Sequence, residues 1–171
     1  MSQFAAIEAC IRQLHARYTD AVWRKDADAF GSCFSEDAQW RIAGRVFHGR
    51  GEIAAGFAQV AASAGRILLT FRTPQLEMTG RGRAGGRVYV TEQCTWRDRP
   101  PSTSIGRYFE HYVDEGDCWR FSWRLFQLFY YGPADLTGDF FEPRDFGAFP
   151  RMPPLDLIPE DFTGRFARET E

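Results

Sequence analysis

The sequence lacks the features that mark several common classes of protein. Its 171 residues include only four cysteines and three histidines, and no two cysteines form a Cys-x-x-Cys pair. We therefore expect free thiols rather than disulfides. No metal site is predicted, because the histidines lie far apart in the sequence. A net charge of −2 and a pI near 6.0 argue against nucleic acid and anionic membranes as partners.

Long apolar runs are also missing. Charged residues interrupt the first 24 positions, so no signal peptide is predicted, and no window holds the roughly 20 apolar residues of a membrane span. A cytoplasmic location is the expectation. The chain has no Gly-x-Gly-x-x-Gly fingerprint, Walker loop or Gly-x-Ser-x-Gly elbow. These absences remove support for nucleotide and serine-hydrolase chemistry, and no cofactor is predicted.

Aromatic residues, by contrast, are abundant. They make up 16% of the chain and recur through residues 106–133, which read as two long strands joined by a tight turn at residues 114–117. Alternation places Tyr108 and Glu110 on one face of the first strand, away from Phe109 and His111. The matching face of the second strand carries Arg124, Phe126 and Leu128, opposite Trp119, Phe121, Trp123 and Leu125.

The order of the other elements predicts the fold class. Apolar residues spaced by three and four predict a helix over residues 4–24, and two shorter helices follow it. Strands are predicted at residues 66–78 and 87–96, before the aromatic hairpin. Helices followed by antiparallel strands form an α+β domain, which we assign to residues 1–131. The proline-rich residues 132–171 are expected to pack on this domain or on a neighbouring subunit.

Three short segments resemble the SnoaL-like branch of the nuclear-transport-factor-2-like superfamily. They are residues 24–26 (Arg-Lys-Asp), 34–40 (Phe-Ser-Glu-Asp-Ala-Gln-Trp) and 48–53 (His-Gly-Arg-Gly-Glu-Ile). The resemblance implies a cone, in which a curved antiparallel sheet wraps around N-terminal helices and encloses one deep pocket. It also implies a small hydrophobic ligand and a homodimer or homotrimer.

Dehydrochlorinase-like and scytalone-dehydratase-like members of this branch use an Asp–His pair as a general base. The resemblance places the Asp position at Trp23 and the His position at Leu69. Neither side chain can transfer a proton, so that mechanism does not carry over. Both are expected to be walls of the pocket.

The remaining polar residues on the inferred pocket face form the candidate site. Glu110 is the candidate general base, with Arg124 to orient it or to stabilise negative charge and Tyr18 to donate a hydrogen bond. A buried ion pair of purely structural value is the alternative for Glu110 and Arg124. Substrate contacts are expected from Trp23, Leu69, Tyr108, Thr91, Gln93, Phe126 and Leu128.

Two functions follow from these predictions. The first is a cofactor-independent lyase, isomerase or cyclase that acts on a small hydrophobic ring compound. The second is a non-catalytic ligand-binding or assembly subunit, which the missing dyad favours. A pocket group with a shifted pKa would support the enzyme. A cavity filled by Trp23 and phenylalanines would support the subunit.

Overall fold

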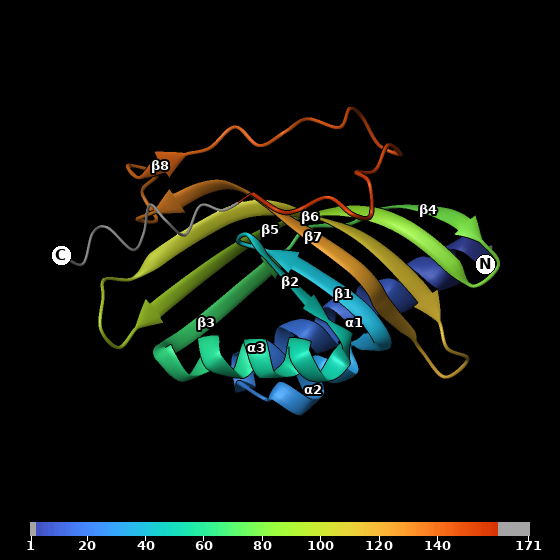
Figure 1. The fold of residues 1–171 in the computed structure, drawn as a ribbon, viewed down its shortest axis with the longest axis horizontal. Helices are drawn as coiled ribbons and strands as arrows, with labels where there is room; N and C mark the ends of the chain where they lie inside the picture. Colours follow the sequence, from blue (N-terminus) through green and yellow to red (C-terminus); the bar gives the residue numbers. More distant parts are fainter. Residues whose placement is uncertain (1–2, 161–171) are drawn as a thin grey trace.

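The computed structural model describes residues 3–160 of the chain. Three helices lie against the concave side of one strongly curved sheet (Figure 1). They are α1 (Gln3–Arg24), α2 (Ala27–Ser32) and α3 (Gly49–Ser63). This is the α+β cone predicted from the sequence.

Eight strands make up the sheet, in the order β2-β1-β7-β6-β5-β3, with β4 paired to β5 and β8 paired to β7. Their bounds are β1 (Phe34–Ile42), β2 (Arg45–His48), β3 (Ala64–Phe71), β4 (Gln75–Gly80), β5 (Arg83–Trp96), β6 (Ser102–Asp114), β7 (Trp119–Gly132) and β8 (Asp139–Phe140). The sheet is mixed rather than wholly antiparallel, because β1 runs parallel to β7. The single strand predicted over residues 66–78 is two strands, separated at residues 72–74.

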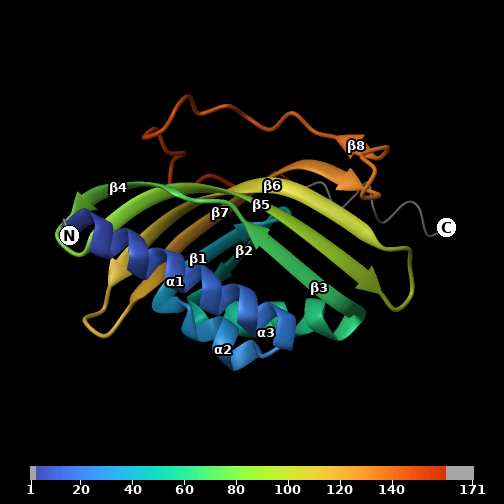
Figure 2. The same cartoon turned by 180° about the vertical axis from the view of Figure 1, so that it is seen from behind.

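Helix α1 forms where the apolar spacing predicts it. Ile11, Leu14, Tyr18 and Val22 are buried along one stripe, which packs into the concave side of the sheet (Figure 2). The next helix, α2, begins at an ordinary N-cap, where the side chain of Asp26 accepts a hydrogen bond from the backbone N–H of Ala29 at 2.9 Å.

The hairpin of β6 and β7 contains a bulge that the alternation did not predict. His111 pairs with Trp123 and Tyr112 pairs with Phe121, so Ser122 has no partner across the ladder. Phe121 therefore faces the helices, on the same side as Arg124. Trp119 shares the parity of Phe121 and faces the same way, so the prediction that these two residues oppose Arg124 is wrong for this reason.

The described part of the C-terminal tail, residues 133–160, crosses the convex side of the sheet (Figures 1 and 2). Phe146, Met152 and Leu157 pack there against Phe109, Trp123 and Leu125. Side chains of the sheet also donate hydrogen bonds to tail carbonyls: Arg41 to Leu157, Arg87 to Gly147 and Arg151, Trp123 to Leu155, and Gln127 to Arg144, at 2.7–3.0 Å. The predicted packing of the tail also includes residues 161–171, which lie outside the described residues.

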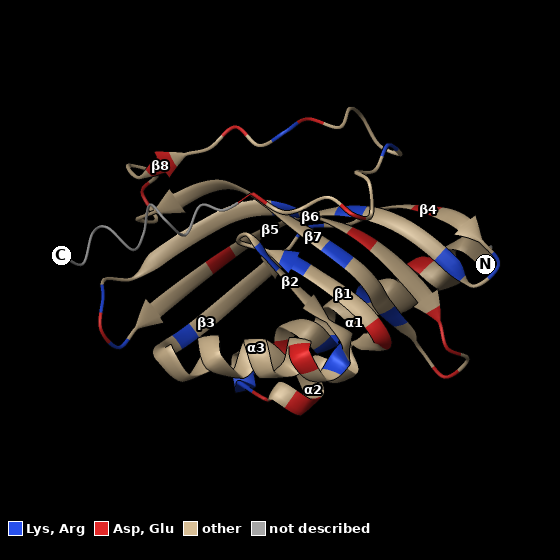
Figure 3. Cartoon of the chain, in the orientation of Figure 1, with Lys and Arg blue, Asp and Glu red and all other residues tan. Residues whose placement is uncertain are grey.

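The surface and the cysteines agree with the composition. Basic and acidic residues are interspersed along the strands and helices (Figure 3). The four cysteines are free thiols, as predicted. Among residues 3–160, no helix is long and apolar enough to cross a membrane.

Candidate functional site

The space between the helices and the sheet holds a cavity of about 230 Å³. Aromatic and aliphatic side chains form most of its wall, and the polar groups are few. Every helix contributes to it, as do strands β1, β3, β5, β6 and β7. The lining includes Tyr18, Phe30, Trp40, Phe57, Leu69, Phe71, Glu92, Ser104, Tyr108, Phe126 and Leu128.

Five of the residues predicted to form the site line this cavity: Tyr18, Leu69, Tyr108, Phe126 and Leu128. Trp23 does not line it. That side chain is 51% exposed in a separate surface groove between α1 and β3, and the guanidinium of Arg66 lies 5.9 Å from its ring. The cavity is therefore not filled by Trp23.

Thr91 and Gln93 lie on the other face of β5 from the cavity. The Thr91 hydroxyl contacts Arg72 at 3.1 Å, and Gln93 is exposed. The residues of opposite parity, Val90 and Glu92, line the cavity instead.

Glu110 and Arg124 are both fully buried, but neither lines the cavity. They form the centre of a polar network beneath its wall. Arg124 Nε donates to Glu110 Oε1 at 2.8 Å, and Arg124 Nη2 lies 2.7 Å from the same oxygen. On the other carboxylate oxygen, Oε2, His15 Nε2 lies at 2.9 Å and the Tyr112 hydroxyl donates a second hydrogen bond.

Aromatic rings surround the Arg124 guanidinium where hydrogen-bond acceptors are missing. Its carbon lies 3.7 Å from the ring centroid of Tyr108, 4.2 Å from that of Phe121 and 4.5 Å from that of Tyr18. Arg124 Nη1 has no hydrogen-bond partner among the described residues, so these cation–π contacts replace the missing acceptors. Tyr18 and Tyr108 thus have Arg124 behind them and the cavity in front.

This network sets the pKa of Glu110. Burial alone would raise it, but His15, Arg124 and Tyr112 outweigh burial and lower the pKa of Glu110 from 4.5 to about 2. A carboxylate with so low a pKa is a weak base at neutral pH. A general base works best when its pKa lies near the working pH. The pKa of Glu110 is far below that range.

Glu92, unlike Glu110, lines the cavity, and it is not among the residues predicted from the sequence. Burial raises the pKa of Glu92, and its contact with the Cys94 thiol, at 3.5 Å, offsets the effect of burial only in part. The signal was present in the sequence, because Glu92 shares its parity along β5 with the apolar residues Val88 and Val90.

The hydroxyl-bearing residues Tyr18, Ser104, Tyr108 and Tyr131 line the cavity with Glu92. Burial raises the pKa of both Tyr18 and Tyr108, while Arg124 acts in the opposite direction. Both are therefore neutral hydrogen-bond donors at physiological pH. Trp40 Nε1 is buried beside them without a hydrogen-bond partner in the described part of the chain.

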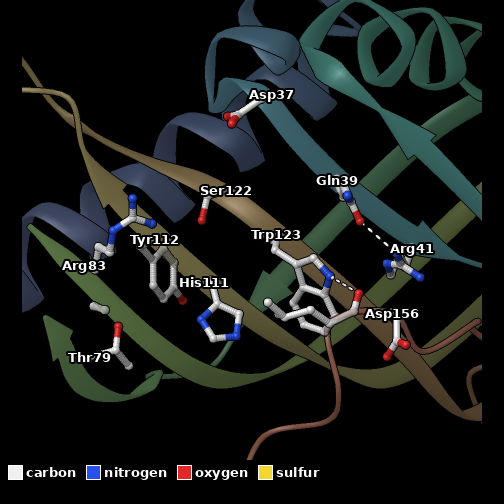
Figure 4. A pocket seen from close by; sticks show the side chains of 12 residues that line it. Asp37, Gln39, Arg41, Thr79, Arg83, His111, Tyr112, Ser122, Trp123 and Asp156 are labelled. Carbon is white, nitrogen blue, oxygen red and sulfur yellow. Dashed lines mark hydrogen bonds between the residues drawn. The ribbon is translucent and has the colours of Figure 1, made fainter.

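A second hollow, of about 430 Å³, lies on the convex side of the sheet beside the tail (Figure 4). Polar and charged residues are the more numerous in its lining, among them Asp37, Arg41, Arg83, His111, Ser122 and Asp156. Burial lowers the pKa of His111, so this imidazole is neutral at physiological pH. Within residues 3–160, no group of three or more His, Cys, Asp or Glu side chains could hold a metal ion.

Solved structures with the same fold include enzymes. A hexachlorocyclohexane dehydrochlorinase (LinA, type 2) is 20% identical with a TM-score of 0.70, over 82% of this chain and 95% of that one. A proposed scytalone dehydratase from Novosphingobium aromaticivorans is 15% identical with a TM-score of 0.72, over 90% and 100%. A proposed aromatic ring hydroxylase from the same organism is 23% identical with a TM-score of 0.68, over 72% and 90%.

At these identities the structural matches show the fold alone. No curated protein matches the sequence significantly. The family model of the SnoaL-like domain, however, matches residues 3–124. That match spans α1 to the middle of β7 and includes most of the elements that enclose the cavity. The chain therefore belongs to the SnoaL-like family.

Proposed function

We infer that this chain binds a small, mainly hydrophobic ring compound in the 230 Å³ cavity and acts on it as a cofactor-independent lyase, isomerase or cyclase. The observation that supports catalysis best is Glu92, a carboxyl with a raised pKa in an aromatic cavity. One structural neighbour, the dehydrochlorinase, is named for a ring substrate, which agrees with this class of ligand.

The volume of the cavity limits the size of the ligand. A dry apolar cavity of ~150 Å³ accommodates benzene, whereas drug-sized ligands occupy sites of roughly 300–1,000 Å³. At about 230 Å³, the cavity suits a compound with one ring and a few substituents. We therefore expect single-ring compounds to bind and fused two-ring compounds to be excluded.

Binding can be tested with cyclohexanone and phenol as single-ring ligands and 2-naphthol as a two-ring ligand. We expect the single-ring compounds to raise the thermal unfolding temperature and to change tryptophan fluorescence, since Trp40 lines the cavity. Leu69→Phe fills part of the cavity and should weaken this binding at least tenfold. Leu68→Phe is the matched control, because Leu68 is 47% exposed on the same strand. Equal loss in both variants, or no binding to the wild type, would refute the cavity as the ligand site.

A non-catalytic ligand-binding or assembly subunit is the second candidate. In its favour, the resemblance places Trp23 and Leu69 at the positions of the Asp–His pair. Of the two only Leu69 lines the cavity, and it cannot transfer a proton. The two functions differ in turnover, and the role of Glu92 decides between them.

A further inference from the structure

We propose that Glu92 is the catalytic base of the cavity and that its substrate is a single-ring ketone, from which it removes a proton on the carbon next to the carbonyl group. In this arrangement the carbonyl oxygen lies at the other end of the cavity, against the Tyr108 and Tyr18 hydroxyls. The inference rests on the proposed function, since it requires a ring compound in the cavity.

Glu92 occupies a row of the sheet that faces the ligand space. It pairs with Leu69 on β3 and with Ser104 on β6, and all three side chains line the cavity. Tyr108 lies four residues beyond Ser104 on β6, which is roughly 13 Å along the strand at ~3.4 Å per residue. The side chains of Glu92 and Tyr108 span part of that distance, and the space left between them accommodates one ring.

Its surroundings leave Glu92 free to accept a proton. Among the described residues it forms no ion pair, and its one hydrogen bond comes from the weak thiol donor of Cys94. Glu110 on the neighbouring strand differs in each respect, because it is held by Arg124, His15 and Tyr112. Glu110 is fully buried and away from the cavity, whereas Glu92 is half-buried and lines it.

The opposite end of the cavity is built to accept negative charge on oxygen. Tyr18 and Tyr108 present neutral hydroxyls, and the Arg124 guanidinium behind their rings, at 4.5 Å and 3.7 Å from the centroids, favours donation from them. The Glu92 carboxylate also acts on both hydroxyls, whose pKa it raises after burial and other neighbours. Base and donors therefore share one cavity.

The chemical step is balanced without another reactant. The Glu92 carboxylate takes the proton from the ring carbon, the C–H electron pair becomes the new C=C bond, and the carbonyl π electrons move to oxygen. The Tyr108 hydroxyl stabilises that oxygen by hydrogen bonding. Return of a proton from Glu92 to the same carbon restores the ketone, and return to a different carbon gives an isomer.

The test uses the full chain and cyclohexanone in D₂O. Proton NMR follows the loss of the signals of the hydrogens next to the carbonyl as solvent deuterium replaces them. We expect the wild type to accelerate this exchange above the buffer rate. Glu92→Gln should lower the protein-dependent rate by about 100- to 10,000-fold while cyclohexanone still binds. Glu77→Gln, at an exposed position on β4, is the control and should exchange like the wild type.

The outcomes separate the two proposals. If cyclohexanone binds and Glu92→Gln exchanges as fast as the wild type, or if the wild type does not exceed the buffer rate, the role of Glu92 is refuted and binding stands. If none of the single-ring compounds binds, the proposed function itself fails. Tyr108→Phe should lower exchange with little loss of binding, and an unchanged rate would overturn the placement of the carbonyl oxygen. Thermal unfolding of each variant confirms that it is folded.

Discussion

Glu92 and Glu110 lie on adjacent strands of one sheet, yet their environments give the same carboxyl group opposite properties. Glu110 has a cation, an imidazole and a phenol within hydrogen-bond distance, and these lower its pKa to about 2. Glu92 has only burial and a thiol, and its pKa is raised. Neighbours that favour the charged form, rather than depth alone, decide which of the two carboxyls has the lower pKa.

For Glu110 we therefore predict a structural effect. Glu110→Gln leaves the Arg124 charge buried without its partner and should lower the free energy of unfolding by about 3–5 kcal/mol. Replacing both residues, as Glu110→Gln with Arg124→Met, should recover much of this loss. Urea denaturation at pH 7 measures both values. If the single variant were as stable as the wild type, the pair would not stabilise the fold.

The same variants have an expected pH dependence. Glu110 has a folded-state pKa of about 2, below its ordinary value of 4.5, so its contribution to stability is complete above pH ~4.5 and is lost as the pH falls toward 2. The shift corresponds to roughly 3 kcal/mol. The stability of the wild type relative to the double variant should decline over that interval. A constant difference would contradict the pKa.

At this scale the sequence predicted some residues of the site and missed others. Tyr18 continues the helical stripe of α1 and Tyr108 follows simple alternation, so both were placed correctly in the cavity. Substrate contacts were predicted for the polar residues Thr91 and Gln93, whereas the apolar Val88 and Val90 indicate the opposite face of β5, which carries Glu92. The contact of His15 with Glu110 could not be predicted from spacing, because the two residues are 95 positions apart in the sequence.

Among the elements, the hairpin of β6 and β7 contributes the most side chains to the wall of the cavity. The two strands pack tightly at Gly106. A Cβ atom there would lie 2.3 Å from the Gln127 carbonyl oxygen and 2.6 Å from the Phe126 ring. We predict that Gly106→Ala destabilises the protein by about 1–3 kcal/mol, because the ring of a cavity residue would have to move.

The control for this prediction is Gly51→Ala in α3. A Cβ atom at Gly51 would meet nothing within 4 Å, and alanine is favoured over glycine in a helix by ~1 kcal/mol. This variant should be as stable as the wild type or more so. Thermal unfolding compares the two, and destabilisation of both by the same amount would remove the steric explanation for Gly106.

Periodicity predicts helices and strands, but it does not reveal irregularities within them. The stripe of α1 and the aromatic hairpin were predicted, because both repeat regularly over many residues. The bulge at Ser122 depends on how β7 pairs with β6 and with β1, which is a property of three strands together. For the same reason the parallel pairing of β1 with β7 could not be predicted from either strand alone.

At the scale of the whole molecule, the tail forms a second apolar cluster on the convex side of the sheet. A chain ending after Pro133 would expose Phe109, Trp123 and Leu125, which Phe146, Met152 and Leu157 now cover. We predict that this truncation lowers the unfolding temperature by more than about 10 °C, since several apolar side chains lose their cover, and that it promotes aggregation. Calorimetry and light scattering test this. A truncated chain of unchanged stability and size would show that the tail is dispensable.

Light scattering of the full chain tests a further expectation, that the protein is a homodimer or homotrimer. The tail presents exposed apolar side chains at Phe140, Leu155 and Ile158, each more than half exposed. If copies associate through this surface, replacing Phe140 and Ile158 with serine should yield monomers without loss of folding. Assemblies of unchanged size would place the contact elsewhere.

The edges of the sheet restrict how two copies could join. One edge is β2, which has only four residues. The other is divided between β3 and β4, and the break at residues 72–74 contains Pro74, which has no N–H to donate. The longest edge segment is the eight residues of β3, so a strand from a second chain has only a short row of backbone groups to pair with. Oligomers should therefore form face to face through side chains, and partly unfolded copies should resist growth into cross-β fibrils.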